Sequence, residues 1–142
     1  MPHMAHYTLI KKLDEQQIDD LHTLYRNEWW TKHRTRKAIK TMLRHTDIII
    51  GIVNKKGKLI GFARVLTDRV FKAEIYDVIV HPDYRDKGLG KMLMRTILHH
   101  KKLRKVRQFN LQCLPEMVPY YARWGFEEHE GLVYLRKKEK IK

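Results

Sequence analysis

The sequence is poor in several features that mark particular protein classes. A single cysteine, Cys113, stands among 142 residues, so no intrachain disulfide is available and a reducing compartment is expected. No apolar run approaches the ~20 residues that a membrane helix needs. The first residues, MPHM, show no basic segment followed by an apolar one, so no secretory signal is expected. Nine histidines are present, but none forms HExxH or a Cys/His grouping, so no metal site is expected.

Acidic residues are also scarce. There are 16 of them against 30 lysines and arginines, which gives a formal net charge of +14. A basic surface attracts polyanions, and both nucleic acid and a phosphate-rich cofactor belong to that class. No nucleic-acid recognition motif accompanies the charge, so nucleic acid is the less favoured partner.

The pattern of apolar residues predicts one mixed α/β domain. Alternation and β-branched content predict strands, and apolar residues three and four apart predict helices. Asp14 followed by Gln17 predicts a capping box at the start of the first helix. Strands are expected at 7–11, 47–53, 58–66, 71–80 and 107–113 with a last hairpin at 126–137, and helices from Asp14 through Trp29 and at 36–44, 89–102 and 116–123.

This order, β-α-α-β-β-β-α-β-α-β-β, predicts a single domain over residues 1–142 with a core at about 7–137 and flexible ends at 1–6 and 138–142. A helix lies between the strands at 71–80 and 107–113, so these two strands are expected to be parallel.

A glycine-containing loop joins the strand that ends at Val80 to the following helix. Backbone N–H groups at a helix start lack intrahelical partners, and glycines let phosphate oxygens approach them. Gly88 and Gly90 lie in this loop, among Arg85, Lys87 and Lys91. Neither GxGxxG nor the P-loop pattern is present. The loop is therefore a candidate phosphate site, and a surface turn with two incidental glycines is the alternative.

Two segments resemble the signatures of the GNAT (GCN5-related N-acetyltransferase) superfamily. They are DVIV…YRDKGLG, residues 77–90, and YYARWGF, residues 120–126. The order of elements is also similar over nearly the whole chain. The resemblance implies a mostly antiparallel mixed sheet with a splayed parallel pair. It also implies an N-acetyltransferase that moves the acetyl group of acetyl-CoA to a primary amine of a small molecule or protein, by direct attack in a ternary complex.

The resemblance also assigns the cofactor contacts. Main-chain N–H groups would bind the pyrophosphate, and a β-bulge would splay the strand that ends at Val80 from the one that ends at Cys113. The slot between them would take the pantetheine, and its N–H donors could stabilise the oxyanion. The implied cofactor-binding residues are Ile79, Val80, Arg85, Asp86, Lys87, Gly88, Leu89, Gly90 and Lys91.

Three residues are candidates for proton transfer. Tyr121 matches the tyrosine of the second signature, where a phenol can protonate the leaving thiolate. The alternatives are that it only packs and hydrogen-bonds the sulfur, or that Tyr120 takes its place. Glu74 and Asp77 match acidic positions of histone- and polyamine-acetylating relatives, and either is a candidate base. The alternative for each is a structural pair with Arg64 or another cation, and a water-mediated base is a further one.

The resemblance also implies that the first helix and the loop after it border the acceptor pocket. Trp30 could contact an amine by a cation–π interaction, and Arg34 could bind a carboxylate or phosphate, as could Arg36. Trp29 continues the apolar stripe of the helix and is expected in the core. Cys113 is expected as a small core residue or in the lining of the slot.

These interpretations predict a cytoplasmic enzyme with acetyl-CoA and an amine as its partners and no membrane. A homodimer is considered. The rival functions are a non-catalytic acyl-CoA-binding regulator with the same fold and, less favoured, a basic nucleic-acid-binding module.

Overall fold

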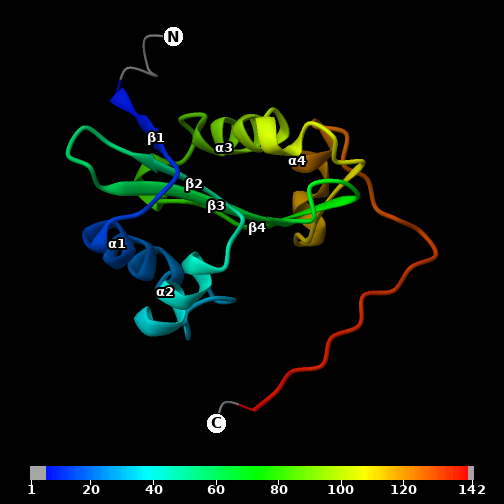
Figure 1. Ribbon diagram of the computed structural model, residues 1–142, viewed down its shortest axis with the longest axis horizontal. Helices are drawn as coiled ribbons and strands as arrows, with labels where there is room; N and C mark the ends of the chain where they lie inside the picture. Colours follow the sequence, from blue (N-terminus) through cyan, green and yellow to red (C-terminus); the bar gives the residue numbers. More distant parts are fainter. Residues whose placement is uncertain (1–5, 141–142) are drawn as a thin grey trace. The chain divides into compact units, whose positions relative to one another are not determined.

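Figure 1 shows the computed structural model, which describes residues 6–140. The expectations for the first residues and for 141–142 fall outside that range. By its internal contacts the chain divides into two compact units, Met1–Gln112 and Cys113–Lys142. Each unit is described by itself, and the assignment of one domain over 1–142 stays a prediction. None of the helices among the described residues is long and apolar enough to cross a membrane.

The first unit contains a five-stranded mixed sheet. Its strands are adjacent in the order β1-β2-β3-β4-β5, and only β4 and β5 are parallel. The predicted parallel pair is therefore confirmed, and the first strand lies at an edge of the sheet. The bounds are β1 (Thr8–Ile10), β2 (Ile48–Val53), β3 (Leu59–Thr67), β4 (Lys72–Val80) and β5 (Gln108–Leu111).

Helices cover both faces of this sheet. Helices α1 (Glu15–Arg26) and α2 (Arg36–Arg44) lie on one face, and α3 (Leu89–Leu98) lies on the other (Figure 1). The predicted capping box is confirmed, because Asp14 and Gln17 each accept a hydrogen bond from the other's backbone N–H. The helix predicted to reach residue 102 ends at Leu98 and is followed by a 3₁₀ turn, η3 (Lys101–Leu103).

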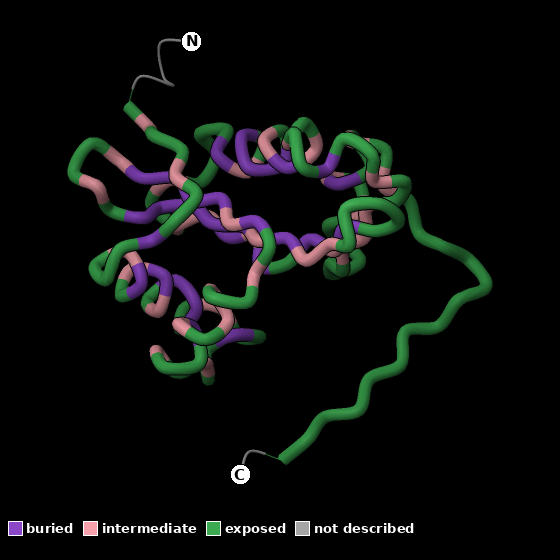
Figure 2. The backbone as a smooth tube through the Cα atoms, viewed as in Figure 1, coloured by how far each residue is buried: buried purple, intermediate pink, exposed green. Residues whose placement is uncertain are grey.

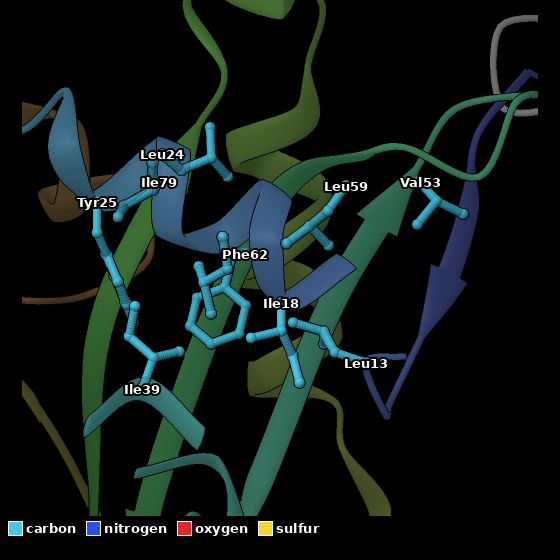
Figure 3. Close-up of a cluster of buried hydrophobic side chains, with 10 residues drawn as sticks. Leu13, Ile18, Leu24, Tyr25, Ile39, Val53, Leu59, Phe62 and Ile79 are labelled. Atoms are coloured by element: carbon cyan, nitrogen blue, oxygen red, sulfur yellow. The ribbon is translucent and has the colours of Figure 1, made fainter. Parts of the chain in front are cut away.

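The buried residues, most of them apolar, lie mainly on the sheet strands and on the helices that cover them (Figure 2). On the α1 side, Tyr25 meets Phe62 edge to face with ring centroids 6.2 Å apart, and Ile18, Ile39 and Ile79 surround them (Figure 3). On the other face, α3 buries five apolar residues, namely Leu89, Met92, Leu93, Met94 and Ile97. This packing holds α1, α2 and β4 in fixed positions around the candidate site.

The second unit contains a 3₁₀ turn, η4 (Pro115–Met117), and a short helix, α4 (Val118–Ala122). The hairpin expected at 126–137 is wrong, because no strand occurs among the described residues after Phe126. Gly131 does form a turn, with φ of 87°. A turn signal fixes only the local bend, and a strand also needs a hydrogen-bonded neighbour, which 132–135 does not have among the described residues.

Candidate functional site

Strand β4 carries the bulge that the sequence analysis expected. On β3, Phe62 and Arg64 are two residues apart, but their partners on β4, Ile79 and Tyr76, are three apart. The extra residue lies beside Asp77, whose φ of 55° is left-handed and unusual for a non-glycine residue. Such a backbone arises where the strand must redirect its side chains.

The bulge decides the face on which the two candidate carboxylates lie. Tyr76 pairs with Arg64 and Ile79 with Phe62, and Phe62 and Ile79 pack against α1, so these residues share the α1 face. Glu74 is two residues before Tyr76 and shares its face. Strict alternation would separate Glu74 from Asp77, but the bulge turns both toward the same side of the sheet.

Beyond the bulge, β4 separates from its parallel neighbour. The β4–β5 pairing runs from Lys72–Gln108 to Ile75–Leu111 and stops there, so residues 76–80 have no strand at that edge among the described residues. The expected splay is therefore present in the backbone. Whether it receives pantetheine stays a prediction.

The backbone groups of Val80 face this open edge. The His81 N–H donates to the Ile60 carbonyl on β3 at 2.8 Å, and peptide groups alternate in direction along a strand. The Val80 N–H and C=O therefore point away from β3, whereas those of Ile79 point toward it. Of the two residues predicted to bind pantetheine through the main chain, Val80 has the suitable orientation.

The loop after β4 presents a continuous row of free backbone donors. No described residue accepts a hydrogen bond from any backbone N–H of residues 86–91, and α3 begins inside this row. Gly88 is the N-cap residue with φ of 82°, and it supplies no side chain to cap the helix. Asp86 is also left-handed, with φ of 63°. A run of N–H groups at a helix start is a site for an anion.

Arg85 joins the loop to neighbouring elements. Its Nε donates to the Val80 carbonyl at 3.2 Å, and its Nη2 lies 3.2 Å from the Glu28 carboxylate. Arg85 thus ties the loop to the end of β4 and to the segment after α1. No side-chain hydrogen bond within the described residues involves Lys87 or Lys91, so both remain available to a ligand.

Asp77 is the centre of a buried polar cluster on the α1 face. Its Oδ2 accepts from the Tyr25 hydroxyl at 2.8 Å, from Arg34 Nη1 at 2.7 Å and from Arg64 Nε at 2.7 Å. Burial raises the pKa of the Asp77 carboxyl, but the hydrogen bonds from Arg34 and Arg64 outweigh burial and hold this pKa below its ordinary value. Burial, followed by the charge of Asp77, raises the pKa of Tyr25.

Tyr25 was not predicted to belong to this cluster, and Arg64 was predicted only as a structural partner of the carboxylates. Both guanidinium groups are held by aromatic rings as well. The Arg34 guanidinium carbon lies 4.6 Å from the centroid of the Tyr25 ring, and that of Arg64 lies 4.9 Å from the centroid of Tyr76.

Glu74 has a simpler environment than Asp77. Its Oε1 accepts a hydrogen bond from Asn110 Nδ2 at 2.7 Å, across the parallel pair. The side chain is partly exposed, and no ion pair within the described residues involves it.

Two expectations for other residues are wrong. Trp29 is 67% exposed, because α1 ends at Arg26 and the apolar stripe stops with it. Cys113 is exposed, because β5 ends at Leu111 before the chain reaches it, so its expected place in the core is wrong. Its alternative place in the lining of the slot stays a prediction. Trp30 is also exposed, at 43%, and its role as an acceptor contact stays a prediction. Arg36 pairs instead with carboxylates of α1.

Tyr121 lies in an aromatic cluster of the second unit. Its ring centroid is 5.1 Å from that of Tyr120, 6.3 Å from that of Trp124 and 6.2 Å from that of Phe126. Tyr121 is buried, and burial raises the pKa of its hydroxyl to about 12. The phenol therefore keeps its proton throughout the neutral range.

Residues 15–126 match the Acetyltransferase (GNAT) family. The chain belongs to this family. A relative called uncharacterized N-acetyltransferase ycf52, from Porphyra purpurea, is 35% identical over 100 residues, which are 68% of this chain and 57% of that protein. GCN5-related N-acetyltransferase 1, chloroplastic, from Arabidopsis thaliana is 27% identical over 141 residues, 96% of this chain and 71% of that one.

Solved structures agree with this GNAT assignment. A GNAT-family protein from Xanthomonas campestris superposes with a TM-score of 0.80 at 27% identity, over 93% of this chain and 94% of that one. The predicted fold class is confirmed. The GNAT chain spans less than two thirds of the length of the ycf52 relative from Porphyra purpurea.

Proposed function

We propose that this GNAT protein transfers an acetyl group from acetyl-CoA to a primary amine of a small molecule or protein, by direct attack in a ternary complex. The observation that carries the proposal is the row of backbone N–H groups at residues 86–91 without partners among the described residues. Unpaired N–H groups at a helix start carry partial positive charge, and an anionic ligand can accept hydrogen bonds from several of them at once. Relatives that are named N-acetyltransferases support the same activity.

The loop and strand β4 supply the cofactor site. The N–H groups of residues 86–91 would bind the pyrophosphate, with formal charge from Arg85, Lys87 and Lys91 around it. The left-handed backbone of Gly88 aims these N–H groups. A residue with a side chain adopts that conformation only at a cost in free energy. The Val80 N–H, on the open edge of β4, would pair with an amide of the pantetheine arm. Acetyl-CoA, rather than a longer acyl-CoA, is the proposed cosubstrate.

The amine must attack as the free base, and two carboxylates are candidates to accept its proton. Asp77 is a weak candidate, because hydrogen bonds from two arginines lower its pKa. Glu74 has only a neutral amide on one of its oxygens. We therefore favour Glu74, acting directly or through a water, and assign Asp77 a positioning role. Both assignments are proposals.

The leaving thiolate needs a proton or a strong hydrogen bond, and Tyr121 is the proposed donor. Its pKa of about 12 keeps the hydroxyl protonated at neutral pH, so it can donate a hydrogen bond. A thiol has an ordinary pKa near ~8.5, so complete proton transfer from this phenol is uphill. Tyr121 would thus stabilise the thiolate mainly by donating a hydrogen bond, and solvent would complete the protonation.

The test is a thermal-shift comparison of acetyl-CoA, CoA and a pantetheine without phosphates, followed by a mass-spectrometric amine screen. The proposal expects stabilisation by both CoA forms and acetylated product with at least one amine. A bound cofactor without turnover over a broad panel would instead support the acyl-CoA-binding regulator. If neither acetyl-CoA nor CoA binds, the proposal is wrong.

We further infer that the protein acts in the cytoplasm and forms a homodimer. The lone cysteine fits a reducing compartment, although the Arabidopsis relative is named a chloroplastic protein. A fluorescent fusion measures the first inference, and light scattering coupled to size exclusion measures the second.

A further inference from the structure

A hollow of about 240 Å³ opens on the α1–α2 face of the first unit, beside the bulge. Its lining has two unlike parts. Ala38, Ile39 and Met42 of α2 form an apolar wall, and Arg34 and Arg64 form a cationic one. A volume of this size suits a small metabolite or the end of a longer side chain.

The cationic wall carries one uncompensated positive charge. Arg34 and Arg64 share a single carboxylate, that of Asp77, and both use its Oδ2. Within residues 6–140, no acidic residue lines the hollow. Other cations of α2 are neutralised differently, since Arg36 and Lys40 pair with carboxylates of α1. The excess charge is also sheltered, because the Arg64 side chain is only 12% exposed.

The two guanidinium groups also keep unused donors. Arg64 gives its Nε to Asp77, and no described residue accepts from its Nη1 or Nη2. Arg34 uses Nη1 for Asp77 and, weakly, for the Met42 sulfur at 3.9 Å, which leaves its Nε and Nη2 without a partner among the described residues. The aromatic faces of Tyr25 and Tyr76 hold both groups in place. The donors are therefore oriented in advance.

We propose that this hollow binds an anionic group of the acceptor, a carboxylate or a phosphate monoester, that lies a few bonds from the reacting amine. The inference rests on the proposed acetyl transfer and names its substrate class. The anion would bridge Arg34 and Arg64, and the aliphatic part of the acceptor would lie on Ala38, Ile39 and Met42. Arg34 and Arg64 are then specificity-determining residues.

The position of the hollow supports this assignment. Asp77, which holds both arginines, belongs to the bulge at which β4 leaves β5 and opens its edge. An acceptor anchored by its anion is thus placed beside the point where the thioester would lie. A second positive charge on the acceptor would face the excess charge of the arginines, so the site disfavours diamines.

The experiment compares amines of matched skeleton. Wild-type protein with acetyl-CoA is given β-alanine and β-alaninamide, 2-aminoethyl phosphate and 2-aminoethanol, and 1,3-diaminopropane, and kcat/KM is expressed per concentration of free-base amine. We expect each anionic amine to exceed its neutral counterpart by at least about tenfold, and the diamine to be the poorest. The two anionic amines compared with each other identify the preferred anion.

Variants locate the effect in the hollow. Arg64→Gln should abolish the preference for each anionic amine over its neutral counterpart. Ala38→Glu provides a second route, because it places a carboxylate on the wall and leaves the Asp77 cluster intact. Residue 38 follows the Thr35 N-cap by three positions, so glutamate there also favours the helix. Lys40→Gln removes an α2 cation outside the hollow and should change nothing.

Calorimetry on protein saturated with CoA gives the same comparison without turnover. β-Alanine should bind more tightly than its amide, and Ala38→Glu should remove the difference. Equal binding of the pair, or a wild-type preference for neutral or dicationic amines, would overturn the inference while acetyl transfer stands. Absence of CoA binding would instead show that the proposed function has failed.

Discussion

At residue 77 the backbone leaves regular strand geometry, and the side chain enters a cluster of three donors. Asp77 Oδ2 joins a tyrosine of α1, an arginine of the segment between α1 and α2, and an arginine of β3. A carboxylate in that position holds four elements together. It also leaves the site with more cationic than anionic charge, because two guanidinium groups share it.

Removal of the Asp77 charge should destabilise the fold. Asp77→Asn leaves Arg34 and Arg64 without a counter-charge in a sheltered place, and we expect the free energy of unfolding to fall by about 3 kcal/mol. Urea denaturation at neutral pH measures this. A loss below about 0.5 kcal/mol would show that the cluster contributes little to stability.

Wild type and Asp77→Asn should also differ in how the free energy of unfolding depends on pH. The folded pKa of Asp77 is lowered, so its contribution is complete above the unfolded pKa of about 3.9 and is lost as pH falls through the folded value. The gap in stability between wild type and Asp77→Asn should be constant above about pH 5 and should shrink below about pH 4. A gap that instead shrinks between pH 6 and 8 would show that another group controls it.

Tyr121 is expected to affect turnover rather than folding. Tyr121→Phe should lower kcat by about 100-fold, and Tyr120→Phe should change it little. Because the pKa of Tyr121 is about 12, no loss of activity from its ionisation is expected up to about pH 10. Steady-state kinetics of both variants across pH measure these effects. If Tyr121→Phe keeps the wild-type kcat and Tyr120→Phe is inactive, Tyr120 is the donor instead of Tyr121.

Among the elements, the loop that enters α3 was the most predictable from sequence. A strand, a basic loop with two glycines and a helix start follow one another within a few residues, and local chemistry sets their geometry. The capping box of α1 was predictable for the same reason. The partners of Asp77 were not, because Tyr25 and Arg34 lie 52 and 43 positions away in the chain.

Two predictions failed because a local pattern shows neither where a helix ends nor which strand lies beside it. The apolar spacing of α1 continues to Trp29, but the chain turns at Asn27, and the Thr31 hydroxyl is buried against the Tyr25 carbonyl instead. A periodic pattern does not show where a helix ends when no glycine or proline marks the end. The expected hairpin after Phe126 likewise had a turn residue but no neighbouring strand among the described residues.

Gly88 allows a matched test of the loop. An alanine would meet nothing within 4 Å there, but it must adopt φ of 82°, which costs about 1–2 kcal/mol. Gly88→Ala should therefore weaken acetyl-CoA binding about tenfold through a displaced donor row. Gly57 has the same open surroundings and φ of 79° in the β2–β3 turn, so Gly57→Ala is the control.

Calorimetric titration of both variants with acetyl-CoA measures this. The two variants should show similar decreases in the free energy of unfolding, measured by urea denaturation. In the titration, only Gly88→Ala should bind acetyl-CoA more weakly than wild type. Equal affinities would mean that the backbone at residue 88 does not form the cofactor site.

At the scale of the whole molecule, the net charge of +14 exceeds what the cofactor loop uses. A second hollow in the first unit, of about 290 Å³, is lined only by basic residues, which are Arg69, Lys101, Lys102, Arg104 and Lys105. Such a surface attracts polyanions without sequence preference. We therefore predict that this part of the basic charge is separate from the proposed acetyl transfer.

Nucleic-acid binding by this surface should be weak and dependent on salt. Lys102→Gln with Lys105→Gln should lower the magnitude of the slope of log affinity against log salt for a single-stranded oligonucleotide by about 1.4, or about 0.7 for each lysine. The same variant should keep the wild-type kcat/KM for acetyl transfer. If acetyl transfer fell together with the slope, the two sites would be connected and the basic surface would belong to the enzyme.

The central claim is that the main-chain amides of residues 86–91 bind the pyrophosphate of acetyl-CoA, and amide NMR measures it most directly. In ¹⁵N-labelled protein, saturating acetyl-CoA should produce its largest shift changes at these amides, and acetyl-pantetheine, which lacks the pyrophosphate, should leave them nearly unchanged. If acetyl-CoA binds and these amides do not respond, or if both ligands shift them equally, the account is contradicted.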